Sequence, residues 1–420
     1  MGRWENKYVI GLTGNIATGK SLVRRMLEHL GAYTIDADGL AHQSMAPGAP
    51  AYQPVIKAFG DWILDAEGRI DRGKLGAVAF AHPDALNRLE ALTHPVVGQA
   101  IDTLIQRSRH KVVVVEAIKL LEGHLAGQMD AIWVVDADEA HQLERLAKRG
   151  LSQAEAIKRI RAQNPQAEKL AQANVVIKNS GSPEDTWAQV RKALQGIQGT
   201  AEAEAEQATV HRVQMQVGSA GAGQHEIKAL DIVRGLPRNA DQIAGLLRQA
   251  SGRVLTRENV LMLFGQKSYM MAIADNEPVG LVGFLVENLV TRVDEFFVSP
   301  QVPMAPITAA LVDAIERASK ELQSEVGYIF VPQGAAPALL DTLKKQGYER
   351  QELDDIRVPA WREAVRESRP DGTLIMAKKL RAERVLKPLG DRPFTPGEVL
   401  FLRLLACCSL EAFGKLQQPF

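Results

Sequence analysis

Cysteine is scarce in this sequence. The 420 residues include only Cys407 and Cys408, which are adjacent near the C-terminus. Adjacent cysteines suit neither the ligand spacing of a metal site nor a framework of structural disulfides. Such sparse use of cysteine is typical of proteins in a reducing compartment, so we expect the protein to be cytoplasmic.

The sequence also lacks net charge and long apolar runs. Fifty basic and 50 acidic residues give a formal charge of zero. This balance argues against nucleic acid or an anionic membrane as the main partner, although a local basic patch for a phosphorylated small molecule stays open. No stretch is long and apolar enough to span a bilayer, and "MGRWENKYVIGLTG" has no apolar region of a signal peptide. We therefore expect a soluble protein without membrane or nucleic-acid partners.

The length predicts more than one domain, because a single core rarely serves 420 residues. In the first half, short runs rich in β-branched residues alternate with amphipathic segments. This alternation predicts an α/β fold with a buried parallel sheet. The expected strands are 8–13, 32–36, 111–116, 131–136 and 174–179.

Composition suggests the domain limits. Residues 199–224 have few large apolar side chains and many Gly, Ala and Ser residues, so we predict a linker there between a first domain (1–198) and a second α/β domain (225–380). Residues 381–420 include Thr395 and Pro396 before an apolar run, which suits a helix start. We predict a C-terminal helical segment docked on the second domain.

The segment "GNIATGKS", residues 14–21, has the spacing G-x-x-x-x-G-K-[ST] between a predicted strand and a predicted amphipathic helix that Gly31 ends. Backbone N–H groups of such a loop converge on phosphate oxygens. The alternative, a chance glycine-rich turn, is disfavoured by the flanking elements. We expect Lys20 to contact the β- and γ-phosphates of ATP and the Ser21 hydroxyl to ligate Mg²⁺. The predicted ATP-binding residues here are Gly14, Asn15, Ile16, Ala17, Thr18, Gly19, Lys20, Ser21 and Leu22.

The second predicted strand ends in two carboxylates. Asp36 and Asp38 alternate along "YTIDADGLAHQ", at the sheet edge where ligands of open α/β folds bind. One of them would accept a proton from an attacking hydroxyl. A helix cap is an equally open interpretation for an aspartate in this position.

From Tyr8 to about Leu194 the sequence resembles the dephospho-coenzyme A kinases. The resemblance rests on seven blocks in the family's order: "IGLTGNIATGKS", "IDADGLAHQ", "PGAPAYQPVIKAFG", "LTHPVV", "LLEG", "HQLERLAKRGLSQAEAIKRIRAQ" and "NVVIKNSGSPEDTWAQV". It implies a P-loop kinase with a helical lid that phosphorylates the ribose 3′-hydroxyl of dephospho-coenzyme A, using ATP and Mg²⁺ and giving CoA and ADP. The resemblance implies that Thr13, Asp38 and Arg145 are catalytic residues, and Lys20 of the phosphate loop is a fourth.

The sequence departs from the family pattern at four positions. Asn15 and Ala17 stand in a loop that usually reads G-G-I-G-S-G-K, so the turn must accommodate two side chains. Lys119 replaces a proline that usually precedes the paired leucines, and Asn174 replaces an aspartate before the last strand. The outer glycines, Lys20 and Ser21 remain, so we expect nucleotide binding to be kept.

Four further side chains are candidates for the site. Arg145 and Arg149 lie four residues apart on one predicted helix face, suited to close over phosphates as a lid; a solvated helix face is the alternative. Glu116 ends "VVVV" and would support Mg²⁺ or the acceptor, unless it is an ordinary carboxylate at a strand end. His94, before Pro95, suits a structural cap or an acceptor contact better than a general base. We thus expect Asp36, His94 and Glu116 to bind the acceptor.

From about Glu226 to Leu380 the order of predicted elements resembles a GNAT acetyltransferase. In that family the loop after the central strand reads [QR]-x-x-G-x-[GA] and cradles a pyrophosphate with backbone N–H groups, whereas here it reads "SPQVPMAPITA". Proline has no N–H, so Pro300, Pro303 and Pro306 compromise the cradle. We expect weak or no binding of CoA or acetyl-CoA. The alternatives are a bifunctional kinase and N-acetyltransferase, or a non-catalytic regulator that binds nucleotide or CoA through both halves.

Overall fold

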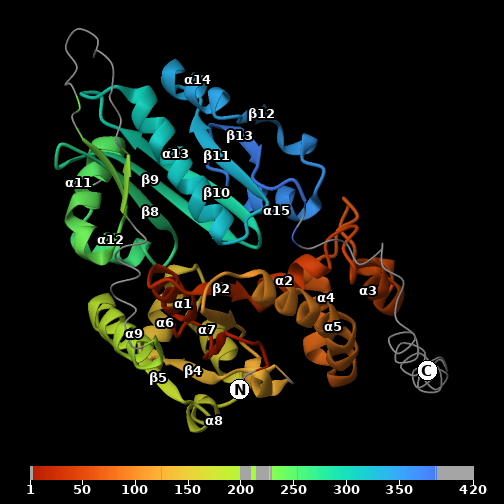
Figure 1. Cartoon of the computed structure of the whole chain (residues 1–420). Helices are drawn as coiled ribbons and strands as arrows, with labels where there is room; N and C mark the ends of the chain where they lie inside the picture. Colours follow the sequence, from red (N-terminus) through yellow and green to blue (C-terminus); the bar gives the residue numbers. More distant parts are fainter. Residues whose placement is uncertain are drawn as a thin grey trace.

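The first sheet has five parallel strands in the order β2-β3-β1-β4-β5. A computed structural model describes residues 3–123, 125–198, 210–213, 227, 229–252, 254–383 and 385, and Figure 1 shows this sheet in its lower half. The strands match the runs expected from the sequence, which confirms the parallel α/β prediction. They are β1 (Tyr8–Thr13), β2 (Tyr33–Asp36), β3 (Val112–Glu116), β4 (Ala131–Asp136) and β5 (Val175–Lys178).

Helices cover both faces of this sheet. On one face α1 and α9 pack through Val23, Leu27, Val190 and Leu194 against alternate strand residues. The end of α5 and part of α2 cover the other face. The helices are α1 (Lys20–His29), α2 (Ala37–Ser44), α3 (Tyr52–Phe59), α4 (Arg72–Ala81), α5 (Pro83–Arg107), α6 (Glu139–Lys148), α7 (Gln153–Arg161), α8 (Gln166–Ala171) and α9 (Pro183–Gln198), with short 3₁₀ turns η1 (Asp61–Ile63), η2 (Leu120–Glu122) and η3 (Ala126–Gln128).

The second sheet has eight strands in the order β12-β13-β11-β10-β9-β8-β7-β6. Neighbours are antiparallel except β10 and β11, which pair in parallel over Val290–Val293 before a bulge in β10. The strands are β6 (Val210–Val213), β7 (Leu230–Arg234), β8 (Ser268–Ala274), β9 (Glu277–Glu287), β10 (Val290–Val298), β11 (Val326–Pro332), β12 (Glu349–Gln351) and β13 (Thr373–Lys379). The prediction of a second α/β domain is confirmed.

Helices also flank the second sheet on both sides. Helix α13 lies on the face that carries Ala272 and Val282, whereas α11 and α12 lie on the face that carries Tyr269 and Met271. Helix α15 packs beside β10. The elements are α11 (Ala240–Ser251), α12 (Arg257–Leu263), α13 (Met304–Glu321), α14 (Pro337–Lys345), α15 (Pro359–Ser368), η4 (Pro237–Asn239) and η5 (Leu353–Asp355).

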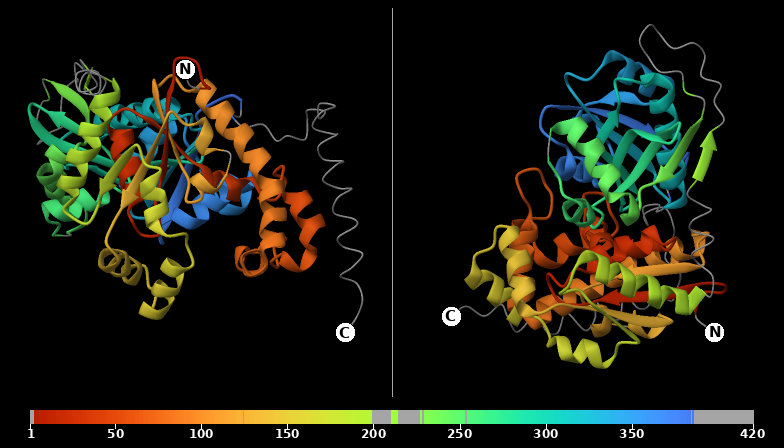
Figure 2. Two further views of the ribbon diagram at one scale, coloured as in Figure 1. Left: turned by 90° about the horizontal axis from the view of Figure 1, so that it is seen from below. Right: turned by 90° about the vertical axis from the view of Figure 1, so that its left-hand side faces the viewer.

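The two domains meet along β2, α1 and α2 of the first and the β9–β10 hairpin of the second, and the right-hand view of Figure 2 shows them stacked one above the other. One hydrophobic cluster continues through both, and the Gln323 side chain donates a hydrogen bond to the Leu104 carbonyl across the boundary at 2.9 Å. The domains therefore share part of their core.

Strand β6 lies inside the 199–224 segment that we expected to be an irregular linker, and it pairs with β7. The prediction considered overall composition and overlooked the local sequence "VHRV", whose valines favour a strand. The other residues of that segment lie outside the described part of the chain, as do Cys407, Cys408 and nearly all of 381–420.

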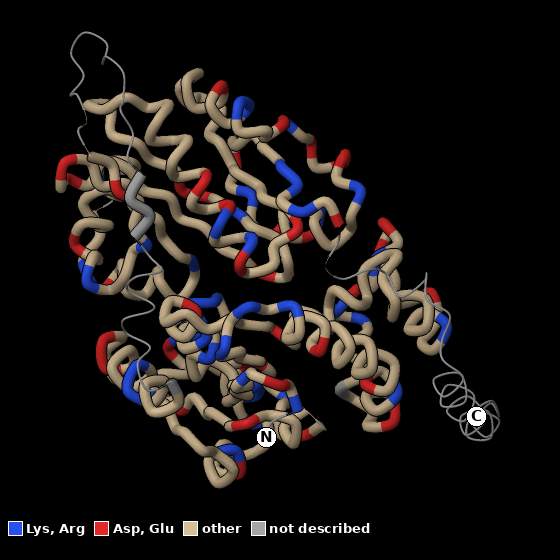
Figure 3. The backbone as a smooth tube through the Cα atoms, in the orientation of Figure 1, with Lys and Arg blue, Asp and Glu red and all other residues tan. Residues whose placement is uncertain are grey.

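Charges of both signs are interspersed over both domains in Figure 3, as expected from the balanced composition. Among the described residues, no helix combines the length and apolar character needed to cross a bilayer.

Candidate active site

The loop of residues 14–19 connects β1 directly to α1. Gly14 and Gly19 have φ angles of +147° and +99°, in the region that favours glycine. A Cβ atom on Gly19 would lie 2.0 Å from Nδ2 of Asn179, so a side chain there would displace Asn179. Because the first N–H groups of a helix lack intrahelical partners, the start of α1 offers donors to an anion at this loop.

The loop accommodates Asn15 and Ala17, the two departures from the family pattern that lie within it. Ala17 has a φ of +60° and is buried in a cluster with Leu146 and Ala156. A left-handed conformation costs alanine about 1–2 kcal/mol, which this packing helps to offset. The Asn15 side chain donates to the carbonyl of Asn164 at 3.1 Å. Both side chains thus join the loop to α6 and the segment that follows it.

Arg145, on α6, donates hydrogen bonds to the backbone of the phosphate loop. Its Nη1 donates to the carbonyls of Ala17 and Thr18, each at 3.0 Å, and its Nη2 donates to the Asn179 carbonyl at 2.6 Å. The Asn179 side chain donates to Thr18 as well, at 2.8 Å. Arg145 therefore fixes the backbone of the phosphate loop. Arg149, one turn further, is exposed.

Two glutamines of the lid region contact the loop and were not identified from the sequence. Gln163 accepts a hydrogen bond from the N–H of Ile16 at 2.6 Å, and Gln166 accepts one from the N–H of Asn15 at 3.1 Å. Gln163 lies within a block that carries the family resemblance, and Gln166 follows it closely. No charge or spacing rule distinguishes them from surface glutamines, so apart from this block the sequence held no signal for these contacts.

Lys20 is buried at the start of α1, and its Nζ donates to the Asn15 carbonyl at 3.2 Å. Burial lowers the pKa of Lys20, while the nearby carboxylates of Glu116 and Asp38 oppose that change. The ammonium group thus lies between the loop and the acidic side chains at the strand ends, where it can bind phosphate.

Asp38 and Thr13 meet at the main chain of Ile118. Asp38 accepts a hydrogen bond from the Ile118 N–H at 3.0 Å, and Thr13 donates to the Ile118 carbonyl at 3.1 Å. Lys169, on α8, donates to the same carbonyl at 2.9 Å. Burial raises the pKa of Asp38, against the opposing effect of the Ile118 hydrogen bond. Lys169 is buried and was missed, because a single lysine in an amphipathic helix has no distinguishing pattern.

Asp36 and Glu116 are opposite each other in the register of β2 and β3, at the carboxyl edge of the sheet. Asp36 caps α2 by accepting the Gly39 N–H at 2.9 Å, so the cap interpretation is confirmed. Glu116 is buried, its Oε1 lies 3.5 Å from Ser21 Oγ, and its Oε2 lies 2.6 Å from Nε of Arg24. Burial raises the pKa of Glu116, and Arg24 opposes the increase.

The oxygens of Ser21 and Glu116 are close enough to serve one cation. Among the described residues there is no group of three or more His, Cys, Asp or Glu side chains that could hold a metal ion. A Mg²⁺ ion that arrives with a nucleotide needs only one or two protein oxygens besides phosphates and water. The donor set therefore fits Mg²⁺ bound together with ATP.

The two remaining candidates are His94 and Leu22. His94 is exposed in the interior of α5, so it caps no helix. The Leu22 side chain points toward the second domain, since a Cβ on Gly265 would lie 2.8 Å from it. Any contact of Leu22 with nucleotide would therefore come from its backbone.

Part of the chain is similar to known proteins. Residues 8–185 match the family model described as dephospho-CoA kinase. The dephospho-CoA kinase of Geobacter metallireducens is 46% identical over 186 residues, covering 43% of this chain and 92% of that protein. A solved dephospho-CoA kinase from Campylobacter jejuni is 27% identical, with a TM-score of 0.36 over 47% of this chain and 99% of its own.

A solved acetyltransferase from Salmonella typhimurium with acetyl-CoA also matches, at 10% identity and a TM-score of 0.30 over 38% of this chain and 97% of its own. The family model matches the segment that carries the phosphate loop, Asp38 and Glu116, and the relative from Geobacter metallireducens is matched over most of its own length. On this basis, the chain belongs to the dephospho-CoA kinase family.

Proposed function

We propose that the protein transfers the γ-phosphoryl group of ATP to the ribose 3′-hydroxyl of dephospho-CoA, giving CoA and ADP. The observation that carries this proposal is the position of Asp38 and Thr13, joined through Ile118, beside Lys20 of the phosphate loop. A phosphate cradle and a carboxylate that can accept a proton are the two parts that phosphoryl transfer to a hydroxyl requires.

In this mechanism the loop and Lys20 hold the β- and γ-phosphates while Asp38 accepts the proton of the 3′-hydroxyl. The bond between the 3′-oxygen and the γ-phosphorus forms as the bond from that phosphorus to the bridging oxygen breaks, and ADP leaves with the electron pair. The transition state is loose, so positioning and positive charge matter most. Lys20 and Lys169 supply positive charge at this point, and Arg145 keeps the loop in shape.

Ser21 and Glu116 would hold Mg²⁺, which neutralises charge on the β- and γ-phosphates when it is bound. Asp36 would support the acceptor side indirectly, by fixing the start of α2 and hence Asp38. The scarcity of cysteine agrees with action in the cytoplasm.

For the second domain we keep the prediction of weak or absent acetyl-CoA binding. The N–H groups of Ser299, Gln301 and Val302 already bind Val279, the Ser299 side chain and the Ser299 carbonyl. Pro300, which lies between them, and Pro303, which follows them, have no N–H. Few donors are therefore left for a pyrophosphate before α13 begins.

A screen of acceptors with the purified full-length protein and MgATP tests the kinase proposal. We expect dephospho-CoA to give the highest kcat/KM among nucleosides, nucleotides and dephospho-CoA. A better substrate from another class would replace the proposed acceptor. Binding of ATP with neither hydrolysis nor transfer to any acceptor would favour the non-catalytic regulator alternative.

A further inference from the structure

The tip of the β9–β10 hairpin of the second domain packs against the kinase domain. Asn288 and Leu289 form its two-residue turn with φ angles of +51° and +66°, a costly conformation for leucine. Leu289 is buried, and the Gln43 side chain donates to the Asn288 carbonyl at 3.2 Å. A strained turn held by contacts to another domain is a candidate for a functional element.

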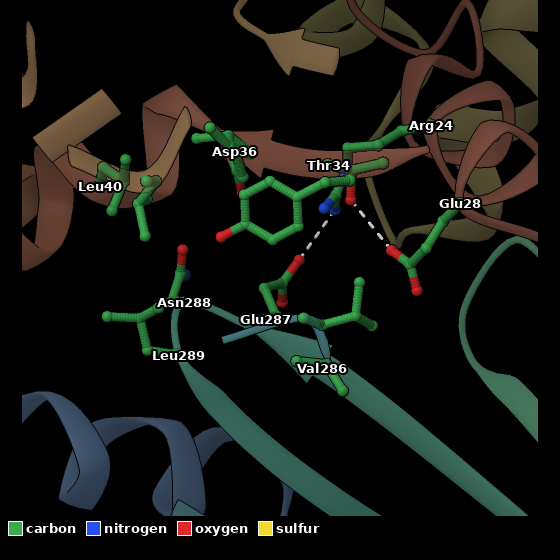
Figure 4. A pocket seen from close by; sticks show the side chains of 13 residues that line it. Arg24, Glu28, Thr34, Asp36, Leu40, Val286, Glu287, Asn288 and Leu289 are labelled. Atoms are coloured by element: carbon green, nitrogen blue, oxygen red, sulfur yellow. Dashed lines mark hydrogen bonds and ion pairs between the residues drawn. The ribbon is translucent and has the colours of Figure 1, made fainter. Parts of the chain in front are cut away.

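Glu287 directly precedes this turn and lies among arginines, as Figure 4 shows for Arg24. Its carboxylate is 2.9 Å from Nη2 of Arg24, 2.9 Å from Nη2 of Arg292 and 3.7 Å from Nη2 of Arg25. Burial favours the neutral form of Glu287, but the three guanidinium groups outweigh it and lower the pKa to about 2. Glu287 is therefore charged at neutral pH.

Arg24 connects Glu287 to the kinase site. Its Nη2 binds Glu287, while its Nε lies 2.6 Å from Oε2 of Glu116. The side chain of Arg24 is only 6% exposed and that of Glu116 only 8%, so water screens this pair weakly. Because Oε1 of Glu116 faces Ser21 Oγ at 3.5 Å, a continuous polar path runs from the second domain to the predicted metal ligand.

We propose that Glu287 is a positioning residue of the kinase site. By holding one side of the Arg24 guanidinium, it limits Arg24 to a single oxygen of Glu116 and leaves the other oxygen facing Ser21. A guanidinium freed from Glu287 would bind both oxygens of Glu116 as a fork, because this geometry is favourable for a carboxylate. The positive charge of Arg24, no longer balanced by Glu287, would also disfavour a cation at Ser21. This inference rests on the proposed function, because it concerns the Mg²⁺ of the bound nucleotide.

The test uses full-length Glu287→Gln and, as a matched control, Glu363→Gln, which removes a pairing of the second domain with Arg69 at 3.7 Å elsewhere on the interface. Calorimetry without acceptor measures ATP affinity with Mg²⁺ and with a chelator. For Glu287→Gln we expect the gain in ATP affinity that Mg²⁺ provides to fall about tenfold, while the affinity for metal-free ATP stays unchanged. An effect of about tenfold is typical of the energetic coupling between two sites of a protein. The control should match the wild type. An unchanged Mg²⁺ gain in Glu287→Gln overturns the proposal.

A double-mutant cycle separates positioning from general damage to the fold. If Glu287 acts through Arg24, Glu287→Gln should have no further effect on the Mg²⁺ gain in an Arg24→Met background. An equal effect in both backgrounds overturns the proposal. Should Glu287→Gln fail to fold, Glu287→Asp replaces it in both assays: a smaller loss of the Mg²⁺ gain supports the proposal, and wild-type binding contradicts it.

Failure of the inference and failure of the kinase assignment give different results. If Lys20→Ala and Ser21→Ala leave ATP binding and turnover unchanged, the proposed function is wrong. If those variants lose activity while Glu287→Gln binds MgATP like the wild type, only the role of Glu287 is wrong.

Discussion

Asp38 and Thr13 bind the two ends of one residue: Asp38 accepts the N–H of Ile118, and Thr13 donates to its carbonyl. The end of β1 and the start of α2 are thereby fixed to the segment after β3. Three chain segments, distant in sequence, thus place a carboxylate and a hydroxyl beside the phosphate loop.

Replacement of Asp38 by asparagine tests the proposed base. The amide oxygen can still accept the Ile118 N–H, but it cannot take up the proton of the hydroxyl. We expect turnover to fall by about a hundredfold or more while ATP affinity, measured by calorimetry, stays within about twofold. Asp36→Asn is the control, because asparagine also caps helices well, and it should remain active. Equal activity of Asp38→Asn and the wild type would assign the role elsewhere, first to Asp36.

Replacement of Lys20 by alanine tests the phosphate loop. A buried ammonium aimed at the β- and γ-phosphates matters most when charge shifts in the transition state. Turnover should fall by about a hundredfold or more in a protein whose circular dichroism matches the wild type. Near-normal turnover of this folded variant would refute the assignment of the loop.

The pH dependence of stability tests the environment of His29, on α1. Burial, with help from Arg234, lowers the pKa of His29 to about 3. The unfolded chain, with a histidine pKa near 6.5, binds this proton more readily than the folded one, so stability is lost as pH falls below about 6.5. At pH 5 the effect is about 2 kcal/mol.

His29→Phe should remove that loss and keep the ring contacts with Phe264 and Trp187. Urea unfolding at about pH 7 and about pH 5 measures it: the free energy of unfolding should change less between these pH values in the variant. The same change in both proteins would show that His29 does not titrate in this way.

The second domain should not act as a general acetyltransferase. The loop before α13 contains Pro300 and Pro303, and three of its N–H groups are used within the protein. The full-length protein with acetyl-CoA and a panel of amines should therefore show no acetyl transfer above the uncatalysed rate. Acetyl transfer that persists in a Lys20→Ala variant would locate an acetyltransferase in the second domain and favour the bifunctional alternative.

Local patterns in the sequence predicted much of the first domain. The runs around Val112–Glu116 and Ala131–Asp136 are short, strongly apolar and rich in valine, a pattern typical of buried parallel strands. The spacing of Gly14, Gly19, Lys20 and Ser21 predicted the phosphate loop, because the backbone of such a loop requires glycines at fixed positions.

Contacts between distant residues were beyond the sequence. Arg24 and Glu287 are 263 positions apart, and nothing local to either residue indicates the other. Lys169 and Gln166 depend in the same way on how α8 packs against the loop. The interdomain path was missed because the linker prediction treated the two halves as separate units.

The most direct test of the kinase assignment is to identify the product. Purified full-length protein is incubated with MgATP and dephospho-CoA, and the product is examined by mass spectrometry and phosphorus NMR. We predict CoA with a monophosphate on the ribose 3′-oxygen, one ADP for each CoA, and far less product with Lys20→Ala over the same time. No new phosphate on dephospho-CoA, or a phosphate at another position, would contradict the assignment.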